Sequence, residues 1–284
     1  MKLRDHLMFV AVILFVAAGW AAAQRVAVVV PDNDSAGVAY AQRLHDALGE
    51  DGFAMTDRSA AEAAFASVGS ETPFNMSAED AAAAGAVIGT DVFILVKGAN
   101  MRRSSFEFPV YHEASAAVYL VSSRSGRLGF WRLQIAQGPS PEAALDGLLK
   151  GPAELAPVLA EEIRELVKTD IAPPRRNRAP ELPPEGSPEI NGLRPPMPYR
   201  RISPKYTPEA FLFDVRATVD IEVEIDAHGK VLHTEVIRWA GYGLDESVDR
   251  TVREMNWRPA DRNGKTLPMR VLLRYNFKKA EPEN

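Results

Sequence analysis

Residues 217–225 read Ala-Thr-Val-Asp-Ile-Glu-Val-Glu-Ile, and this stretch decides the fold of the C-terminal part of the chain. Its five apolar residues occupy every second position, and its four polar residues stand between them. Strict alternation of this kind predicts a β-strand with one face on a core and the other toward solvent. Gly229 follows within Asp226–Lys230, where it favours a tight turn. Residues 231–239 are therefore predicted to return as an antiparallel strand.

The pattern changes its period after Gly243. Apolar residues then recur every three or four positions, which predicts a helix over 244–256 with one apolar stripe. Trp257 follows the helix and is predicted to anchor it to the sheet. Alternation returns over 269–277 and predicts a third strand. Residues 203–279 are thus predicted to form a small ββαβ domain, a short antiparallel sheet with one helix on it. The stripe consists of Leu244, Val248, Val252 and Met255.

This region resembles the C-terminal domain of TonB, the energy transducer of bacterial envelopes. The resemblance covers about residues 203–277 and rests on PKYTPEA (204–210), ATVDIEVEIDAHGKV (217–231), GLDESVDRTVREMNWRPADRNGKTL (243–267) and VLLRYNF (271–277), in that order. It implies a protein partner, an outer-membrane receptor or another envelope protein, whose extended peptide adds to a sheet edge. It also implies an inner-membrane motor complex as a further partner.

By the same resemblance, the last strand is the docking edge. The side chains of Arg270, Arg274 and Asn276 would flank the peptide, or alternatively they guard an exposed edge against aggregation. The predicted partner-binding residues are Met269, Arg270, Val271, Leu272, Leu273, Arg274, Tyr275, Asn276 and Phe277.

Residues 24–170 carry alternating strand and helix signals. The order β-α-β-α-α-β-β-β-α predicts an α/β domain with a mixed sheet, so the whole chain combines α/β and α+β classes. Pro152 and Pro157 are predicted to interrupt or kink the last helix. The predicted strands are 25–30, 53–56, 92–96, 111–122 and 128–136, and the predicted helices are 36–48, 60–66, 81–88 and 140–168.

Four segments of this region loosely resemble the α/β envelope domain of the TolB N-terminal and CsgG-type group. They are VAVVVPD (26–32), AMTDRSAAEAAF (54–65), GAVIGTDVFILVKG (85–98) and AVYLVSSRSGRLGFWR (117–132). The resemblance implies a scaffold that docks partners and does not catalyse a reaction.

Proline separates the two domains. Eleven of the 21 prolines lie between Pro173 and Pro208. Because proline avoids helix interiors and central strands, residues 171–202 are predicted to be a semi-rigid Pro- and Arg-rich linker. Extended at about 3.1 Å per residue, it would span on the order of 100 Å. Its arginines either bind an anionic surface or keep the linker solvated. Residues 280–284 are predicted to be a tail.

The N-terminus predicts export. Met1–Arg4 is positively charged, residues 7–23 are apolar, and Ala21 and Ala23 suit a cleavage site before Gln24. Residues 1–23 are predicted to be a secretory signal peptide, which would place the mature chain in the periplasm. The alternative is an uncleaved anchor in the inner membrane that faces the periplasm.

Composition excludes several classes of function. The chain has no cysteine, so it has no disulfide or thiolate site, and its net charge of −5 argues against nucleic-acid binding. The five histidines lack metal-ligand spacing, and Asn263–Thr266 lacks the first glycine of a phosphate loop because Pro259 stands there. We therefore expect no cofactor, no metal and no enzymatic activity.

Two functions stay open at this point. The first is a TonB-like periplasmic module that docks extended peptides of outer-membrane partners by strand addition, in energy-coupled transport across the membrane. The alternative is a soluble periplasmic scaffold or assembly protein that binds proteins without transducing energy. The sequence leaves the oligomeric state open.

Overall fold

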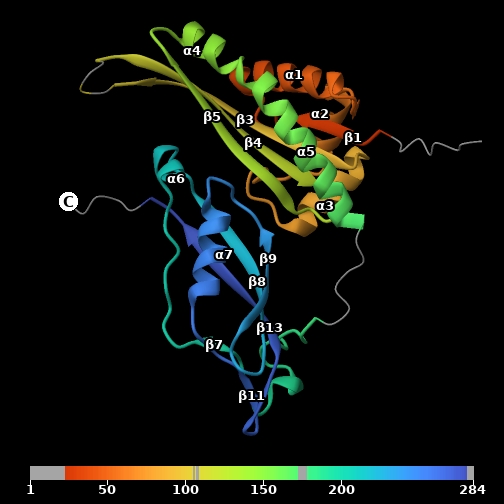
Figure 1. The fold of residues 1–284 in the computed structure, drawn as a ribbon, viewed down its shortest axis with the longest axis vertical. Helices are drawn as coiled ribbons and strands as arrows, with labels where there is room; N and C mark the ends of the chain where they lie inside the picture. Colours follow the sequence, from red (N-terminus) through yellow and green to blue (C-terminus); the bar gives the residue numbers. More distant parts are fainter. Residues whose placement is uncertain (1–22, 105, 107–108, 172–177, 280–284) are drawn as a thin grey trace, which may run out of the picture.

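The computed structural model describes residues 23–104, 106, 109–171 and 178–279. Two units pack on one another (Figure 1). The N-terminal unit, residues 25–171, contains a five-stranded sheet, and the C-terminal unit, residues 178–279, contains the three-stranded sheet of β8, β9 and β13. The predicted signal peptide or anchor, except Ala23, and the tail 280–284 lie outside the described residues, so both stay predictions. No helix within the described ranges is long and apolar enough to cross a membrane.

The N-terminal unit has the predicted order of elements. Its sheet runs β2-β1-β3-β4-β5, with β1 parallel to β2 and β3, and with β3, β4 and β5 antiparallel. The predicted mixed sheet is confirmed. The elements are β1 (Arg25–Val29), α1 (Ser35–Glu50), β2 (Ala54–Met55), α2 (Arg58–Ser67), α3 (Ala78–Ile88), β3 (Val92–Arg103), β4 (Tyr111–Ser122), β5 (Leu128–Gly138), α4 (Pro141–Leu148) and α5 (Gly151–Ile171).

The long C-terminal helix of this unit is divided differently from the prediction. It ends and restarts around Leu149–Lys150, between α4 and α5. Pro152 lies in the first turn of α5, where no intrahelical donor is needed. Pro157 lies inside α5 and does not interrupt it, while the alternative that it kinks the helix stays a prediction.

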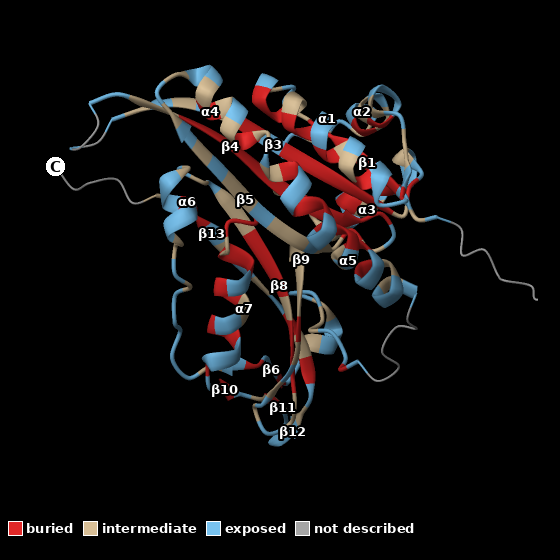
Figure 2. Ribbon diagram, turned by 45° about the horizontal axis from the view of Figure 1, so that its top comes forward, coloured by how far each residue is buried: buried red, intermediate tan, exposed pale blue. Residues whose placement is uncertain are grey.

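Apolar residues cover both faces of this sheet. One face packs against α1, α4 and α5 in a continuous core. The other face packs against α2, α3 and the C-terminal unit. Figure 2 shows β1, β3 and β4 as buried strands in the middle, with β5 far more exposed at the border.

The C-terminal unit has the predicted ββαβ arrangement. Its sheet has the order β13-β8-β9, and the apolar stripe of α7 is buried against it. Trp257 is buried, and its Nε1 donates to the carbonyl of Val252 at 3.2 Å, so the predicted anchor is confirmed. The elements are α6 (Pro208–Leu212), β8 (Ala217–Ile225), β9 (Val231–Arg238), α7 (Leu244–Glu254), β10 (Trp257–Arg258), β11 (Ala260–Arg262), β12 (Lys265–Leu267) and β13 (Met269–Phe277).

The described part of the predicted linker, residues 178–202, packs on the C-terminal unit. After the short 3-10 helix η1 (Pro188–Ile190), β6 (Leu193–Arg194) pairs with β11 and β7 (Met197–Pro198) pairs with β10. These pairs are only two residues long and lie at sheet borders, where proline is tolerated. The expectation of an extended spacer is therefore wrong for residues 178–202, while residues 172–177 lie outside the described chain.

Aromatic side chains join the two units. Trp239, which is fully buried, lies with its ring centroid 5.7 Å from that of Tyr119 on β4, and its Nε1 donates to the carbonyl of Gly126 at 3.1 Å. Tyr242 packs on Trp131 of β5 with 4.9 Å between centroids. Gly241 has φ +69°, and a Cβ there would lie 2.6 Å from Trp131, so this close approach requires glycine.

A single asparagine adds polar contacts to this interface between the two units, which we call the joint. Asn75, in the loop between α2 and α3, donates through Nδ2 to the carbonyls of Thr218 and Trp239, both at 2.7 Å. Its Oδ1 accepts from the amide of Thr218 at 2.9 Å. Arg238 in turn donates to the carbonyl of Asn75 at 2.9 Å. The side-chain amide thereby serves backbone groups at two separate points of the C-terminal unit, which fixes the contact between the units.

Candidate functional site

The predicted docking strand is an outer strand of its sheet. All nine residues of β13 pair with β8 on one side, from Met269 opposite Ile225 to Phe277 opposite Ala217. Side chains at odd positions turn toward the core, and those at even positions turn to the other face, where Leu272 is 56% exposed. The strand thus has one sheet edge that β8 does not use.

Contacts at Arg270 show which backbone groups point to this edge. Its amide donates to the carbonyl of Pro180 at 2.8 Å, and its carbonyl accepts from the amide of Leu182 at 2.9 Å. Glu181 thereby forms a parallel bridge with Arg270. Since residues of an antiparallel strand alternate between inward and outward bonding, Leu272, Arg274 and Asn276 also direct their backbone groups away from β8.

A groove runs along this edge. It has a volume of about 470 Å³ and lies between β13 and the segment 195–203. The first position of the edge is taken by residues 180–182, and among the described residues no backbone group pairs with the outward amides farther along. An extended chain could therefore enter between the strand and this segment. Most of the side chains that line the groove are apolar, among them Leu182, Pro196, Met197, Ile202, Leu273 and Tyr275.

The predicted flanking side chains already have partners inside the domain. Arg274 donates to Asp220 through Nε at 2.7 Å and Nη2 at 2.9 Å, and Arg270 donates to Glu222 at 2.7 Å. Asn276 accepts from the hydroxyl of Thr218 at 2.8 Å. Their contact with a docked peptide stays a prediction. These side chains would have to bind the peptide while they also bond to Asp220, Glu222 and Thr218.

Asp220 explains why these arginines lie where they do. Its side chain is only 6% exposed, so a charge there needs compensation. The hydrogen bonds from Arg274, and then those from Arg238, hold the pKa of this carboxyl below its ordinary value despite the opposing effect of burial. The sheet face away from α7 therefore carries ion pairs between neighbouring strands.

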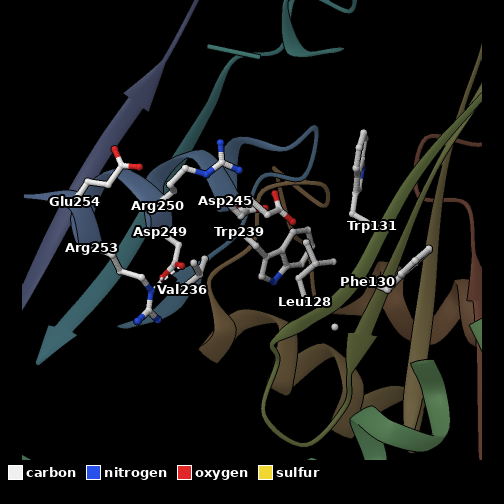
Figure 3. A pocket seen from close by; sticks show the side chains of 12 residues that line it. Leu128, Phe130, Trp131, Val236, Trp239, Asp245, Asp249, Arg250, Arg253 and Glu254 are labelled. Carbon is white, nitrogen blue, oxygen red and sulfur yellow. Dashed lines mark hydrogen bonds and ion pairs between the residues drawn. The ribbon is translucent and has the colours of Figure 1, made fainter. Parts of the chain in front are cut away.

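A second hollow, which the sequence did not indicate, lies between the two units. This cleft of about 600 Å³ separates β5 from α7 (Figure 3). Its apolar lining comes from both units, and α7 contributes the charged side chains. Asp245 is a buried residue of its lining and accepts from the amides of Ala240 at 2.9 Å and Gly241 at 2.7 Å. Burial raises the pKa of this carboxyl to about 7.

The remaining sequence motifs have structural roles. Asn263, with φ +54°, forms the turn between β11 and β12, as expected for a hairpin and not for a phosphate loop. His228 is exposed in the turn between β8 and β9. Within the described residues, no three His, Asp or Glu side chains gather in a way that could hold a metal ion.

Comparison with known proteins identifies the C-terminal unit. Residues 202–278 match the family described as Gram-negative bacterial TonB protein C-terminal. The C-terminal unit is thus a TonB-type domain, a protein-binding module. No curated protein matches the chain.

Solved structures also resemble parts of the chain. The C-terminal domain of Pseudomonas aeruginosa TonB is 18% identical, with a TM-score of 0.28, over 34% of this chain and 97% of that one. Lipoprotein GNA1162 from Neisseria meningitidis is 16% identical, with a TM-score of 0.31, over 51% and 99%. The PelC dodecamer from Paraburkholderia phytofirmans is 11% identical, with a TM-score of 0.30, over 48% and 88%. The resemblance of residues 24–170 to the TolB and CsgG-type group stays a prediction.

Proposed function

We propose that this chain is a periplasmic envelope protein whose TonB-type domain binds an extended segment of an outer-membrane partner by strand addition to β13. The partner's backbone would bond to the outward amides and carbonyls of Leu272, Arg274 and Asn276. Its side chains on the groove side would rest against Met197, Ile202 and the other apolar residues there. The role is one of binding, and no catalytic step belongs to it.

One observation carries this proposal. The edge of β13 already accepts a strand, because Pro180 and Leu182 bond to both backbone groups of Arg270 in parallel orientation. A partner strand would continue this pairing along the same edge and in the same groove. Sheet edges with free backbone groups are the usual template for such addition.

We further propose that the chain acts as an adaptor that holds its partner against the N-terminal unit. The aromatic joint and Asn75 fix the two units to one another, and residues 178–202 lie along the domain instead of extending from it. A chain arranged this way has little length with which to reach across the periplasm. These features support the scaffold over energy-coupled transport.

The state of residues 1–23 tests the choice between these two modes. Intact mass and cell fractionation in a bacterial host would show either cleavage before Gln24 or a full-length chain in the inner membrane. A soluble periplasmic product agrees with the adaptor. An anchored product would instead favour a TonB-type transducer that works with a motor complex.

Strand addition itself is tested with one backbone donor. Leu272→Pro removes an amide that points away from β8, so the β8–β13 ladder should survive while docking is lost. The probe is an array of short peptides from the periplasm-facing segments of Gram-negative outer-membrane proteins. We expect peptides that bind the wild-type chain and Leu272→Ala but not Leu272→Pro.

Hydrogen exchange gives a second readout in the same complex. A bound peptide should slow exchange at the amides of Leu272, Arg274 and Asn276 and leave those of Leu273 and Tyr275 unchanged, since the latter already bond to β8. Equal peptide binding by Leu272→Ala and Leu272→Pro, with no change at these amides, would refute docking at β13.

A further inference from the structure

The outer edge of β5 is also unpaired. β5 bonds to β4 on one side, and no backbone group of the described residues bonds to its other side. None of its eleven residues is buried, whereas ten of the twelve residues of β4 are. Figure 1 shows β5 as the border of the upper sheet nearest to α6 and α7. A long strand thus presents free donors and acceptors beside the joint.

β5 has little of the usual protection of an edge: its pairing with β4 is interrupted by one bulge, at Gly129 near its start, and is regular from Phe130 to Gly138. It contains no proline and one charged residue, Arg132. Arg132 lies over the ring of Phe130 at 5.5 Å, and Phe130 packs with the core under α4 and α5, so this charge does not guard the face toward the C-terminal unit. The opposite border strand, β2, is only two residues long. Proteins normally shorten, charge or cover such an edge.

The face of β5 toward the C-terminal unit is an apolar row. Trp131 and Leu133 pack against the core that the two units share, and Ile135, two positions farther, is 40% exposed. Alternate residues of a strand share a face, so a strand added to β5 would place its own side chains beside this row. Apolar side chains suit those positions.

The cleft between β5 and α7 lies at the start of this row. Figure 3 shows Leu128, Trp131 and Trp239 beside the opening, with the charged side chains of α7 opposite. The about 600 Å³ of the cleft can take a large apolar side chain. α7 surrounds it with more carboxylates than guanidinium groups, namely Asp245, Glu246, Asp249 and Glu254 against Arg250 and Arg253.

Pairing within the helix leaves a negative rim. Asp249 and Arg253 form an ion pair at 2.9 Å and offset one another. Glu246 and Glu254 are exposed, and Arg250 is the one remaining cation among the described residues that line the cleft. A segment that enters the cleft therefore meets an apolar floor and a net negative border, which favours lysine or arginine next to an apolar anchor.

We propose that the edge of β5 and the adjoining cleft form a second docking surface, which binds an extended segment of a partner protein with alternating apolar and basic residues and one large apolar anchor. This surface is separate from β13, and the inference does not depend on docking there. The chain would then bind one partner at each unit.

The test uses two fluorescent synthetic peptides and the full chain. The first peptide alternates valine with lysine around a central phenylalanine, and the second has glutamate in place of lysine. Anisotropy should show at least about tenfold tighter binding of the lysine peptide, with a preference that falls as salt is raised. The double variant Glu246→Lys, Glu254→Lys should remove this preference.

Matched variants locate the site. Ile135→Lys places a positive charge in the apolar row of β5, beside the added strand, and should weaken binding of the lysine peptide about tenfold. Val158→Lys makes the same change at a similarly exposed site on α5, 42% against 40%, and should bind like wild type, as should Leu272→Pro. Thermal unfolding checks that each variant is folded.

Three outcomes would overturn the proposal. The first is equal binding of the two peptides, and the second is wild-type binding by folded Ile135→Lys. The third is a concentration-dependent dimer that Ile135→Lys dissociates in sedimentation, because the occupant would then be a second copy of this chain. Loss of binding in Leu272→Pro alone would place the peptide at β13 instead.

Discussion

The two sheets of this molecule differ in the side chains that lie on their two faces. The sheet of β1 to β5 has apolar cores on both faces, one under α1, α4 and α5 and the other against α2, α3 and the C-terminal unit. The sheet of β8, β9 and β13 has an apolar core only under α7. Its other face carries ion pairs, of which Arg274–Asp220 and Arg270–Glu222 are the shortest between neighbouring strands.

This difference separates two sources of stability. Apolar burial contributes in proportion to area and holds the units together. Ion pairs near a surface contribute little, because water screens them and long side chains lose freedom. We therefore expect substitutions in the joint to lower the free energy of unfolding more than substitutions on the charged face.

The strongest test of this comparison is Trp239→Ala. Removal of this fully buried side chain leaves a cavity at the joint and should lower the free energy of unfolding by about 4 kcal/mol. Small-angle scattering should also show the two units loosening. Trp257→Ala serves as the control, because it empties the core under α7 away from the joint. A loss below about 1 kcal/mol at Trp239 would contradict an apolar joint.

Asn75→Ala tests the polar part of the joint. The carbonyls of Thr218 and Trp239 and the amide of Thr218 would lose their partner, which should cost about 2 to 3 kcal/mol in urea unfolding. Asn100→Ala is a matched control, since Asn100 makes one exposed bond to the carbonyl of Pro141. Similar costs at both positions would mean that Asn75 does not hold the units together.

Asp220→Asn tests the charged face. We expect a loss of about 1 to 2 kcal/mol at neutral pH, since Arg274 and Arg238 would keep only weaker, neutral partners. The folded pKa of this carboxyl is lowered, so its stabilisation is present above the unfolded value of about 3.9 and is lost as pH falls through the folded value. Urea unfolding from neutral to strongly acidic pH should thus show the two proteins converging. A constant difference would contradict the pairing.

The smallest effect belongs to Arg178→Ala. Arg178 reaches Glu222 at 2.7 Å and Glu235 at 3.1 Å, but it is partly exposed. We expect a cost of about 0.5 kcal/mol that disappears at high salt. A cost as large as that of Asn75→Ala would contradict the expectation that ion pairs on the charged face contribute less to stability than contacts in the joint.

Local patterns made much of this fold predictable. The alternation of 217–225 and the stripe of 244–256 each specify an element within a few residues, and both elements form as predicted. The contacts of residues 178–202 are different, because the two-residue strands β6 and β7 have no period to read. Their partners β11 and β10 lie more than fifty positions away.

The site was predictable only in part. Residues 269–277 do form an outer strand, while docking on it stays a prediction. The outward direction of Leu272 could not be derived from sequence, since it follows from the bonds of Arg270 to Pro180 and Leu182. Nor did any pattern mark Asn75, a loop residue whose importance comes from the backbone groups that folding brings to it.

The pairing of residues 180–182 with Arg270 has a consequence for any competitor. A segment tethered to its own binding site acts at an effective concentration on the order of millimolar. A free peptide of equal intrinsic affinity at micromolar levels is outcompeted by it, so such a strand begins beyond it, at Leu272. The tethered segment therefore acts as a stop that fixes the register of whatever pairs with the rest of β13.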